Sequence, residues 1–112
     1  MFEVLVIYRW ASLGGVERML LNRAHAFKEH GRDVRLNVFF MEDIGGAKAL
    51  NDYAQAHNIE SHFRVIDSPH SISPDLTISI DTPDALSIIP ESWPLVMECG
   101  NFIVKAYKFL HS

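Results

Sequence analysis

The fold of this chain is decided by residues 3–31, which read EVLVIYRWASLGGVERMLLNRAHAFKEHG. Residues 4–8 form an unbroken, largely β-branched apolar run, which is typical of a strand covered on both faces in a parallel sheet. From Val16 onward, apolar side chains recur at helical spacing, and Gly31 provides a left-handed stop for that helix. The stretch therefore predicts a strand, a loop that ends in two adjacent glycines, and a helix.

Gly14 and Gly15 stand where the predicted helix begins. A strand, a glycine turn and a helix together present backbone N–H groups and a positive helix end to an anion, most often a phosphate. The dinucleotide-binding fingerprint needs a third glycine and an acidic residue about 20 residues further on, and this chain has only the adjacent pair. A nicotinamide or flavin site is therefore not favoured. Two interpretations of the pair stay open, a phosphate cradle and a tight turn without a ligand.

The rest of the chain continues the alternation of strands and helices. We expect strands over 34–41, 63–66, 76–80 and 95–98, and helices over 47–57, through 86–89 and over 102–110. This order predicts a single α/β domain over residues 1–112, Rossmann-like, with three layers (α/β/α) and a mostly parallel sheet. Ligands of such sheets gather at the carboxyl ends of the strands.

The sequence also resembles a known family. Residues 14–18, which read GGVER, together with LLN at 20–22 and HGRDV at 30–34, resemble the first strand and helix of GT-B glycosyltransferases. The resemblance is to the large retaining group that uses nucleotide-sugar donors, of the group 1 or family 4 type. It continues at residues 74–81 and 94–98, which look like later strands of the same domain.

The resemblance implies transfer of a hexose from a nucleotide sugar to an unknown acceptor, with no cofactor and no metal. It places the backbone amides of Gly14 and Gly15 against the donor diphosphate. Glu17 belongs to the matching motif, either close to the substrate or as a first-turn acid that complements the helix dipole. Nothing in the chain corresponds to the family's second, donor-binding domain. The chain thus looks like a partial N-terminal, acceptor-side domain, and we expect it to be inactive alone.

The catalytic group is less clear from the sequence. Members of the family often place a histidine in the loop after the fifth strand, where this chain has Gly100. Asp81 is the candidate to act as a base or to orient an acceptor hydroxyl, and its alternative role is a helix N-cap. Glu98 and Asn101 are candidates to lie near the substrate. Trp10 is a further candidate, either stacking on a sugar or simply packing in the fold.

Composition narrows the functional classes. With 48% hydrophobic residues, the chain has enough apolar side chains for a packed core. The net charge of −4 and the pI near 5.8 favour neither nucleic acid nor an anionic membrane as a partner. Its start lacks the features of a signal peptide, and a lone cysteine, Cys99, agrees with a reducing compartment, so we expect a cytoplasmic protein. The histidine spacings do not predict a zinc site.

Two alternatives to the transferase remain. The first is a stand-alone α/β binding or interaction module without catalytic activity, which Gly100 and the missing donor domain favour. The second is a fragment of a dehydrogenase with Glu42 or Asp43 on a ribose, which the missing third glycine disfavours. The expected partners are the nucleotide sugar, the acceptor and the missing domain, and exposed strand edges make self-association a further hypothesis.

Overall fold

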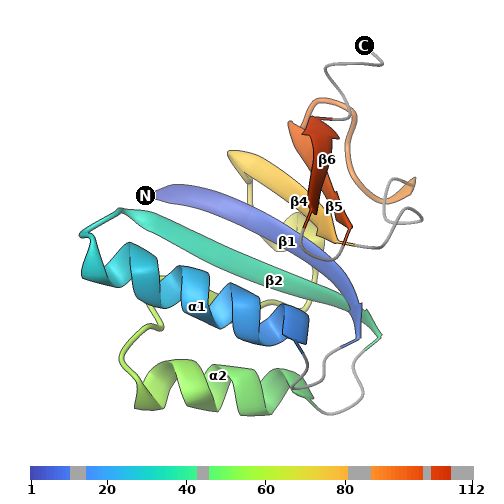
Figure 1. Cartoon of the computed structure of the whole chain (residues 1–112). Helices are drawn as coiled ribbons and strands as arrows, with labels where there is room; N and C mark the ends of the chain where they lie inside the picture. Colours follow the sequence, from blue (N-terminus) through green and yellow to red (C-terminus); the bar gives the residue numbers. More distant parts are fainter. Residues whose placement is uncertain (11–14, 43–45, 81–86, 100–101, 107–112) are drawn as a thin grey trace.

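The computed structural model describes residues 1–10, 15–42, 46–80, 87–99 and 102–106. Its centre is a six-stranded sheet in the order β3-β2-β1-β4-β5-β6 (Figure 1). The strands are β1 (Phe2–Trp10), β2 (Val34–Glu42), β3 (Phe63–Val65), β4 (Leu76–Ile80), β5 (Leu95–Cys99) and β6 (Phe102–Ala106). Strands β1 to β5 pair in parallel, and β6 pairs with β5 in antiparallel fashion. The predicted Rossmann-like α/β fold with a mostly parallel sheet is therefore confirmed.

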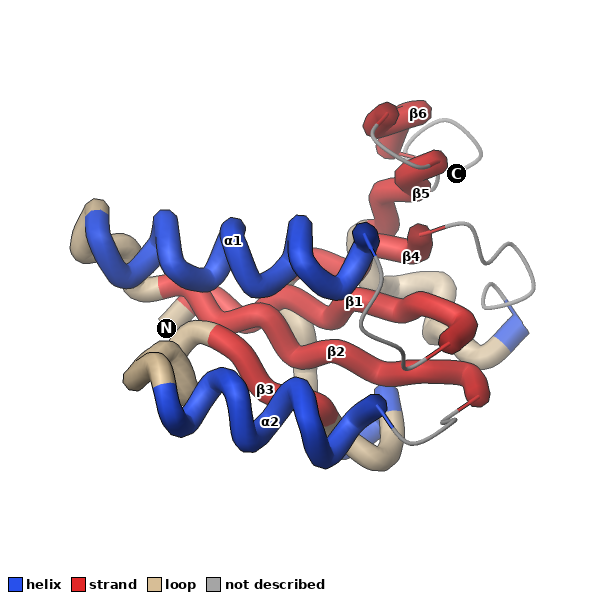
Figure 2. The backbone as a smooth tube through the Cα atoms, turned by 60° about the horizontal axis from the view of Figure 1, so that its bottom comes forward, coloured by secondary structure: helices blue, strands red, loops and turns tan. Residues whose placement is uncertain are grey.

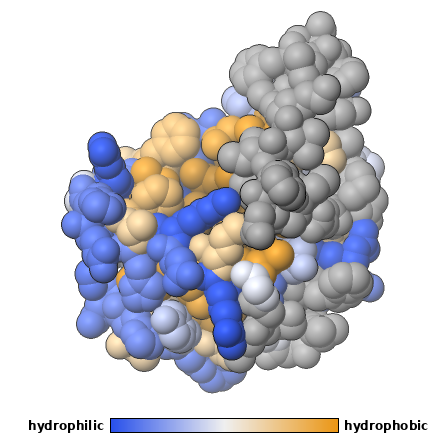
Figure 3. All heavy atoms as spheres, in the orientation of Figure 1, coloured by the Kyte–Doolittle hydropathy of each residue, from blue (hydrophilic) through white to orange (hydrophobic). Residues whose placement is uncertain are grey.

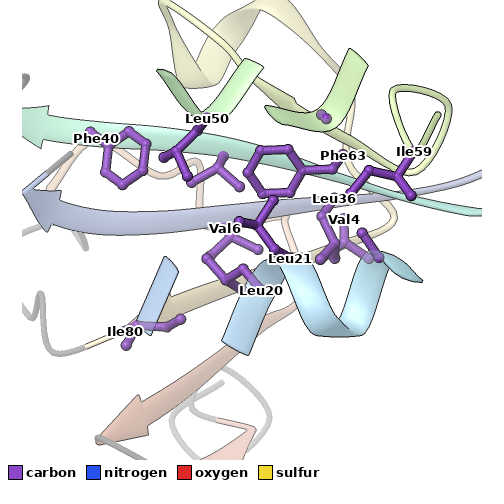
Figure 4. Close-up of a cluster of buried hydrophobic side chains, with 13 residues drawn as sticks. Val4, Val6, Leu20, Leu21, Leu36, Phe40, Leu50, Ile59, Phe63 and Ile80 are labelled. Atoms are coloured by element: carbon purple, nitrogen blue, oxygen red, sulfur yellow. The ribbon is translucent and has the colours of Figure 1, made fainter. Parts of the chain in front are cut away.

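Two helices, α1 (Gly15–Glu29) and α2 (Gly46–Ala56), lie side by side on one face of the sheet (Figures 1 and 2). Val4 and Val6 of β1 and Leu36, Val38 and Phe40 of β2 point toward them, and Val6 and Val38 are fully buried there. Leu20 of α1 and Leu50 of α2 close this core from the helix side (Figure 4). Burial of a side chain of this size stabilises a protein by about 2 kcal/mol. The apolar faces of β1, β2, α1 and α2 thus pack together in one hydrophobic cluster.

The other face of the sheet is covered differently. Leu5 and Ile7 of β1 point to it and are fully buried, as is Leu95 of β5. The residues packed against them come from β2 on the same face of the sheet and from connecting segments, among them Ile72, which follows the short 3-10 helix η1 (Pro69–Ser71). No residue of α1 or α2 belongs to this second cluster within the described part of the chain. The described residues therefore cover one face with helices and the other with connections.

A polar network crosses the amino ends of three strands on this second face. The Asn37 amide is fully buried, and its Nδ2 donates to Glu3 Oε2 at 3.1 Å and to the Val4 carbonyl at 3.2 Å. Arg64 Nε donates to Asn37 Oδ1, and Arg35 Nε donates to Glu3 Oε1 at 3.0 Å. These bonds link the amino ends of β1, β2 and β3, whereas the predicted ligand loops follow the carboxyl ends of the strands.

The end of α1 follows the sequence prediction. Gly31 has a φ of +63°, in the left-handed region that glycine enters without strain. Its N–H donates to the Lys28 carbonyl, and the Arg32 N–H donates to the Phe27 carbonyl at 2.8 Å. This pair of bonds is a Schellman motif, which satisfies carbonyls that the helix leaves without partners.

The prediction of a helix over residues 102–110 is wrong for residues 102–106, and residues 107–110 lie outside the described residues. Residues 102–106 form β6, which pairs with β5 from Cys99 and Phe102 onward. Phe102, Ile103 and Val104 are aromatic and β-branched, so they prefer a strand. Only Gly100 and Asn101 separate the two strands in sequence, a combination typical of a hairpin connection. Of the predicted helix through 86–89, residue 86 lies outside the described residues, and residues 87–89 do not form an α-helix.

Candidate functional site

The strand order creates a switch point between β1 and β4. These two strands are neighbours in the sheet, yet the chain proceeds from β1 to β2 on one side and from β4 to β5 on the other. The connections that leave their carboxyl ends therefore diverge. In open α/β sheets, ligands bind in the crevice that such divergence leaves.

Most residues proposed from the sequence follow strands that end at this edge. Trp10 is the last residue of β1, and Glu98 pairs with Ile80, the last residue of β4. The side chains of Trp10 and Glu98 lie outside the described part of the structure. Gly14, Asp81 and Asn101 also lie outside the described residues, so their predicted roles stay predictions.

Gly15 is the first residue of α1, the helix that follows β1 in the chain. Its φ is not in the left-handed region, and a Cβ built on it would meet no atom within 4 Å. The described structure therefore leaves room for a side chain at this position, in contrast to Gly31.

Glu17 lies in the first turn of α1, as expected of an acid that complements the helix dipole. The structure adds that Glu17 is only 1% exposed. A buried carboxylate requires compensating interactions, and the residue is engaged by an interaction within the protein. The sequence prediction did not anticipate this burial, because an acid near a helix start is usually solvated.

A cleft of about 370 Å³ opens beside Glu17, between α1 and α2. Its lining comes mainly from α1, with one residue from α2: Glu17, Arg18, Leu21, Asn22 and Tyr53. The face of the molecule that carries the two helices is mostly hydrophilic, with hydrophobic residues showing between polar ones (Figure 3). Pockets for small molecules typically measure about 300–1,000 Å³, so the cleft has the size of a small binding site.

Three rings meet next to this cleft and join the two helices. Tyr53 stacks on His57 with a centroid distance of 4.0 Å, and His25 meets both rings edge-on. His25 Nε2 lies 3.4 Å from Tyr53 Oη. Such contacts between rings hold an aromatic side chain in one orientation. The Tyr53 ring is thus a fixed wall of the cleft.

Sequence reasoning missed the cleft and the ring cluster. Tyr53 lies within the helix predicted over 47–57, and its side chain is 37% exposed. Its contact with His25 joins residues 28 positions apart. Such a pairing depends on how the two helices are aligned, which periodicity within each helix does not reveal. The (i, i+4) spacing of Tyr53 and His57 was the one signal available, since it puts both rings on the same side of a helix.

Other kinds of site find no support in the described ranges. No three His, Cys, Asp or Glu side chains come together there in a way that would hold a metal ion. None of the helices in those ranges combines the length and apolarity needed to cross a membrane. Comparison of the chain with protein-family models, with curated proteins and with solved structures gave no match.

Proposed function

We propose that this chain is the N-terminal, acceptor-side part of a glycosyltransferase that moves a sugar from a nucleotide-sugar donor to an acceptor. The observation that carries the proposal is the position of the glycine pair. In the sequence the pair follows β1 and leads into α1, whose first residue is Gly15, and β1 borders β4 at the switch point. Asp81 follows β4 in sequence and so belongs to the second of the two connections that diverge there.

In this proposal the first turn of α1 receives the donor diphosphate. The Gly15 N–H and the positive end of α1 stabilise the negative charge that develops on the leaving diphosphate, together with the amide of Gly14. The open space around the Gly15 Cα is consistent with such an approach, because a ligand phosphate can reach the backbone there. Asp81 would orient the acceptor hydroxyl or take its proton. The second domain that the resemblance implies would supply most contacts to the nucleotide.

Binding of donor sugars tests the proposal. We expect uridine or guanosine diphosphate sugars to bind weakly in calorimetric titrations, and Gly15→Val to abolish this binding. The added side chain has no protein atom to clash with in the described structure, so the loss would come from a blocked ligand position and not from unfolding. Ala26→Val is the matched control, because it adds bulk to an exposed position of the same helix.

Three results would count against the proposal. Equal binding of the donor by Gly15→Val and by the wild type would show that the glycine turn does not contact the donor. Absence of binding by wild type would favour the stand-alone interaction module. Binding of NADH in place of nucleotide sugars would favour the dehydrogenase fragment.

A further inference from the structure

We infer that the cleft between α1 and α2 is a separate binding site for one neutral pyranose ring, such as a single residue of a glycan. This inference goes beyond the donor role proposed for the glycine turn. It rests on the composition, charge and size of the cleft and on the fixed aromatic ring in its wall.

The polar groups of the lining suit a ligand that carries hydroxyl groups. Arg18 and Asn22 are both exposed, lie one helical turn apart and line the cleft together. The Arg18 guanidinium offers several N–H donors in a plane, and the Asn22 amide offers both donors and an acceptor. Two neighbouring hydroxyls of a pyranose present matching donors and acceptors at similar spacing. This pair therefore forms the polar side of the proposed site.

The apolar side of the cleft suits the C–H face of a sugar ring. Leu21 is nearly buried beneath the cleft, and the half-exposed Tyr53 ring stands at its wall. Because His57 stacks on Tyr53 and His25 contacts it edge-on, a ligand would not need to order this ring on binding. Such pre-organisation lowers the entropic cost of association.

Charge and size restrict the ligand further. Among the residues that the structure describes, the lining holds one acid, Glu17, and one base, Arg18, so their formal charges cancel. A phosphate would meet the Glu17 carboxylate as well as the Arg18 guanidinium, and an amine would meet the guanidinium as well as the carboxylate. Neither charge therefore gains a net attraction from the described lining, and a neutral ligand loses nothing by comparison. A cleft of about 370 Å³ lies near the lower end of the range for small-molecule sites. It therefore suits one ring better than a dinucleotide.

Saturation-transfer NMR with neutral methyl glycosides tests the site. The probes are the methyl glycosides of glucose, galactose, mannose and N-acetylglucosamine at millimolar concentration. We expect transfer from the protein to the ring protons of at least one probe, with amide shifts at Asn22 and its neighbours. Tyr53→Ala should weaken binding about tenfold, a loss of about 1.4 kcal/mol, and Asn22→Ala should weaken it as well.

Two further variants keep the test specific. Tyr53→Phe retains the ring and should retain binding, whereas Gln55→Ala changes an exposed residue of α2 outside the lining and should change nothing. All variants should keep the wild-type far-UV circular dichroism spectrum. The inference is overturned if no glycoside shows transfer, if transfer survives both Tyr53→Ala and Asn22→Ala, or if glucosamine or a sugar phosphate binds more tightly than the neutral probes.

These outcomes are independent of the donor role of the glycine turn. The glycosides carry no phosphate, and the expected shifts lie at Asn22, about two turns along α1 from Gly15. Gly15→Val should abolish donor binding and leave glycoside binding intact. The donor titration and the glycoside titration therefore test the two proposals separately, and failure of one does not decide the other.

Discussion

At the scale of single residues, Asn37 illustrates how a buried polar group is held. Its amide donates to Glu3 Oε2 and to the Val4 carbonyl, and it is fully buried. Asn37→Asp replaces the donor by an oxygen that faces a carboxylate and a carbonyl, so two attractive contacts become repulsive. We expect the free energy of unfolding, measured by urea denaturation, to fall by about 2 kcal/mol.

Asn51→Asp is the matched control for this change. Asn51 is exposed and uses its Oδ1 to accept the Val65 N–H at 2.9 Å, a role that an aspartate oxygen performs equally well. We expect its unfolding free energy to stay within about 0.5 kcal/mol of the wild type. Equal stability of the two variants would contradict the role of Asn37 described above.

The burial of polar side chains such as Asn37 could not be predicted from the sequence. The unbroken apolar run over residues 4–8 was enough to predict a buried strand. The burial of Asn37 depends on Glu3 and Arg64, which lie on two other strands and far away in the sequence. Glu17 is a similar case, since a carboxylate in a first helical turn gives no sign that the folded chain will bury it.

At the scale of elements, the two glycines of α1 have different roles. Gly31 ends the helix with a φ of +63°, and alanine in that conformation costs about 1–2 kcal/mol. Gly15 begins the helix with no such conformation and with open space around it. We expect Gly31→Ala to lower the free energy of unfolding by about 1 kcal/mol in chemical denaturation, and Gly15→Ala to leave it unchanged or raised. The reverse order of stabilities would show that the end of α1 is misassigned.

Most elements were predictable because each carries its own local signal. The strands from β1 to β5 combine β-branched residues with flanking turn residues, and α1 and α2 have apolar stripes at helical spacing. The prediction failed at β6, where residues 102–110 also read as a helix. Pairing with β5 decided the outcome there, and pairing between strands is a property of two segments that neither segment shows alone.

At the scale of the whole molecule, β6 covers one edge of the sheet. Its only neighbour in the sheet is β5, so a chain that ends at Cys99 keeps β1 to β5 and both helices. We expect this shortened chain to unfold cooperatively but to expose the edge of β5, which invites pairing between molecules. Light scattering should show an average mass that rises with concentration more steeply than for the full chain. An unchanged, monomeric mass would contradict the role of β6 as an edge cover.

The candidate site was predictable only in part at this scale. The Gly14-Gly15 pair and the strand pattern led to the carboxyl edge of the sheet, because the rule that ligands gather there needs only the order of the elements. The cleft between α1 and α2 required their alignment in space, and the ring contact of His25 with Tyr53 required it as well.

The central claim is that the first turn of α1 binds the diphosphate of a nucleotide sugar. The most direct measurement is an NMR titration of the isotopically labelled chain with uridine and guanosine diphosphate sugars. We expect saturable shifts at the amides of Gly15 and Val16, no comparable shift at Tyr53, and loss of these shifts in Gly15→Val. Absence of any shift at Gly15 and Val16 at millimolar ligand, or shifts that persist in Gly15→Val, would contradict the claim and leave the glycine pair as a turn.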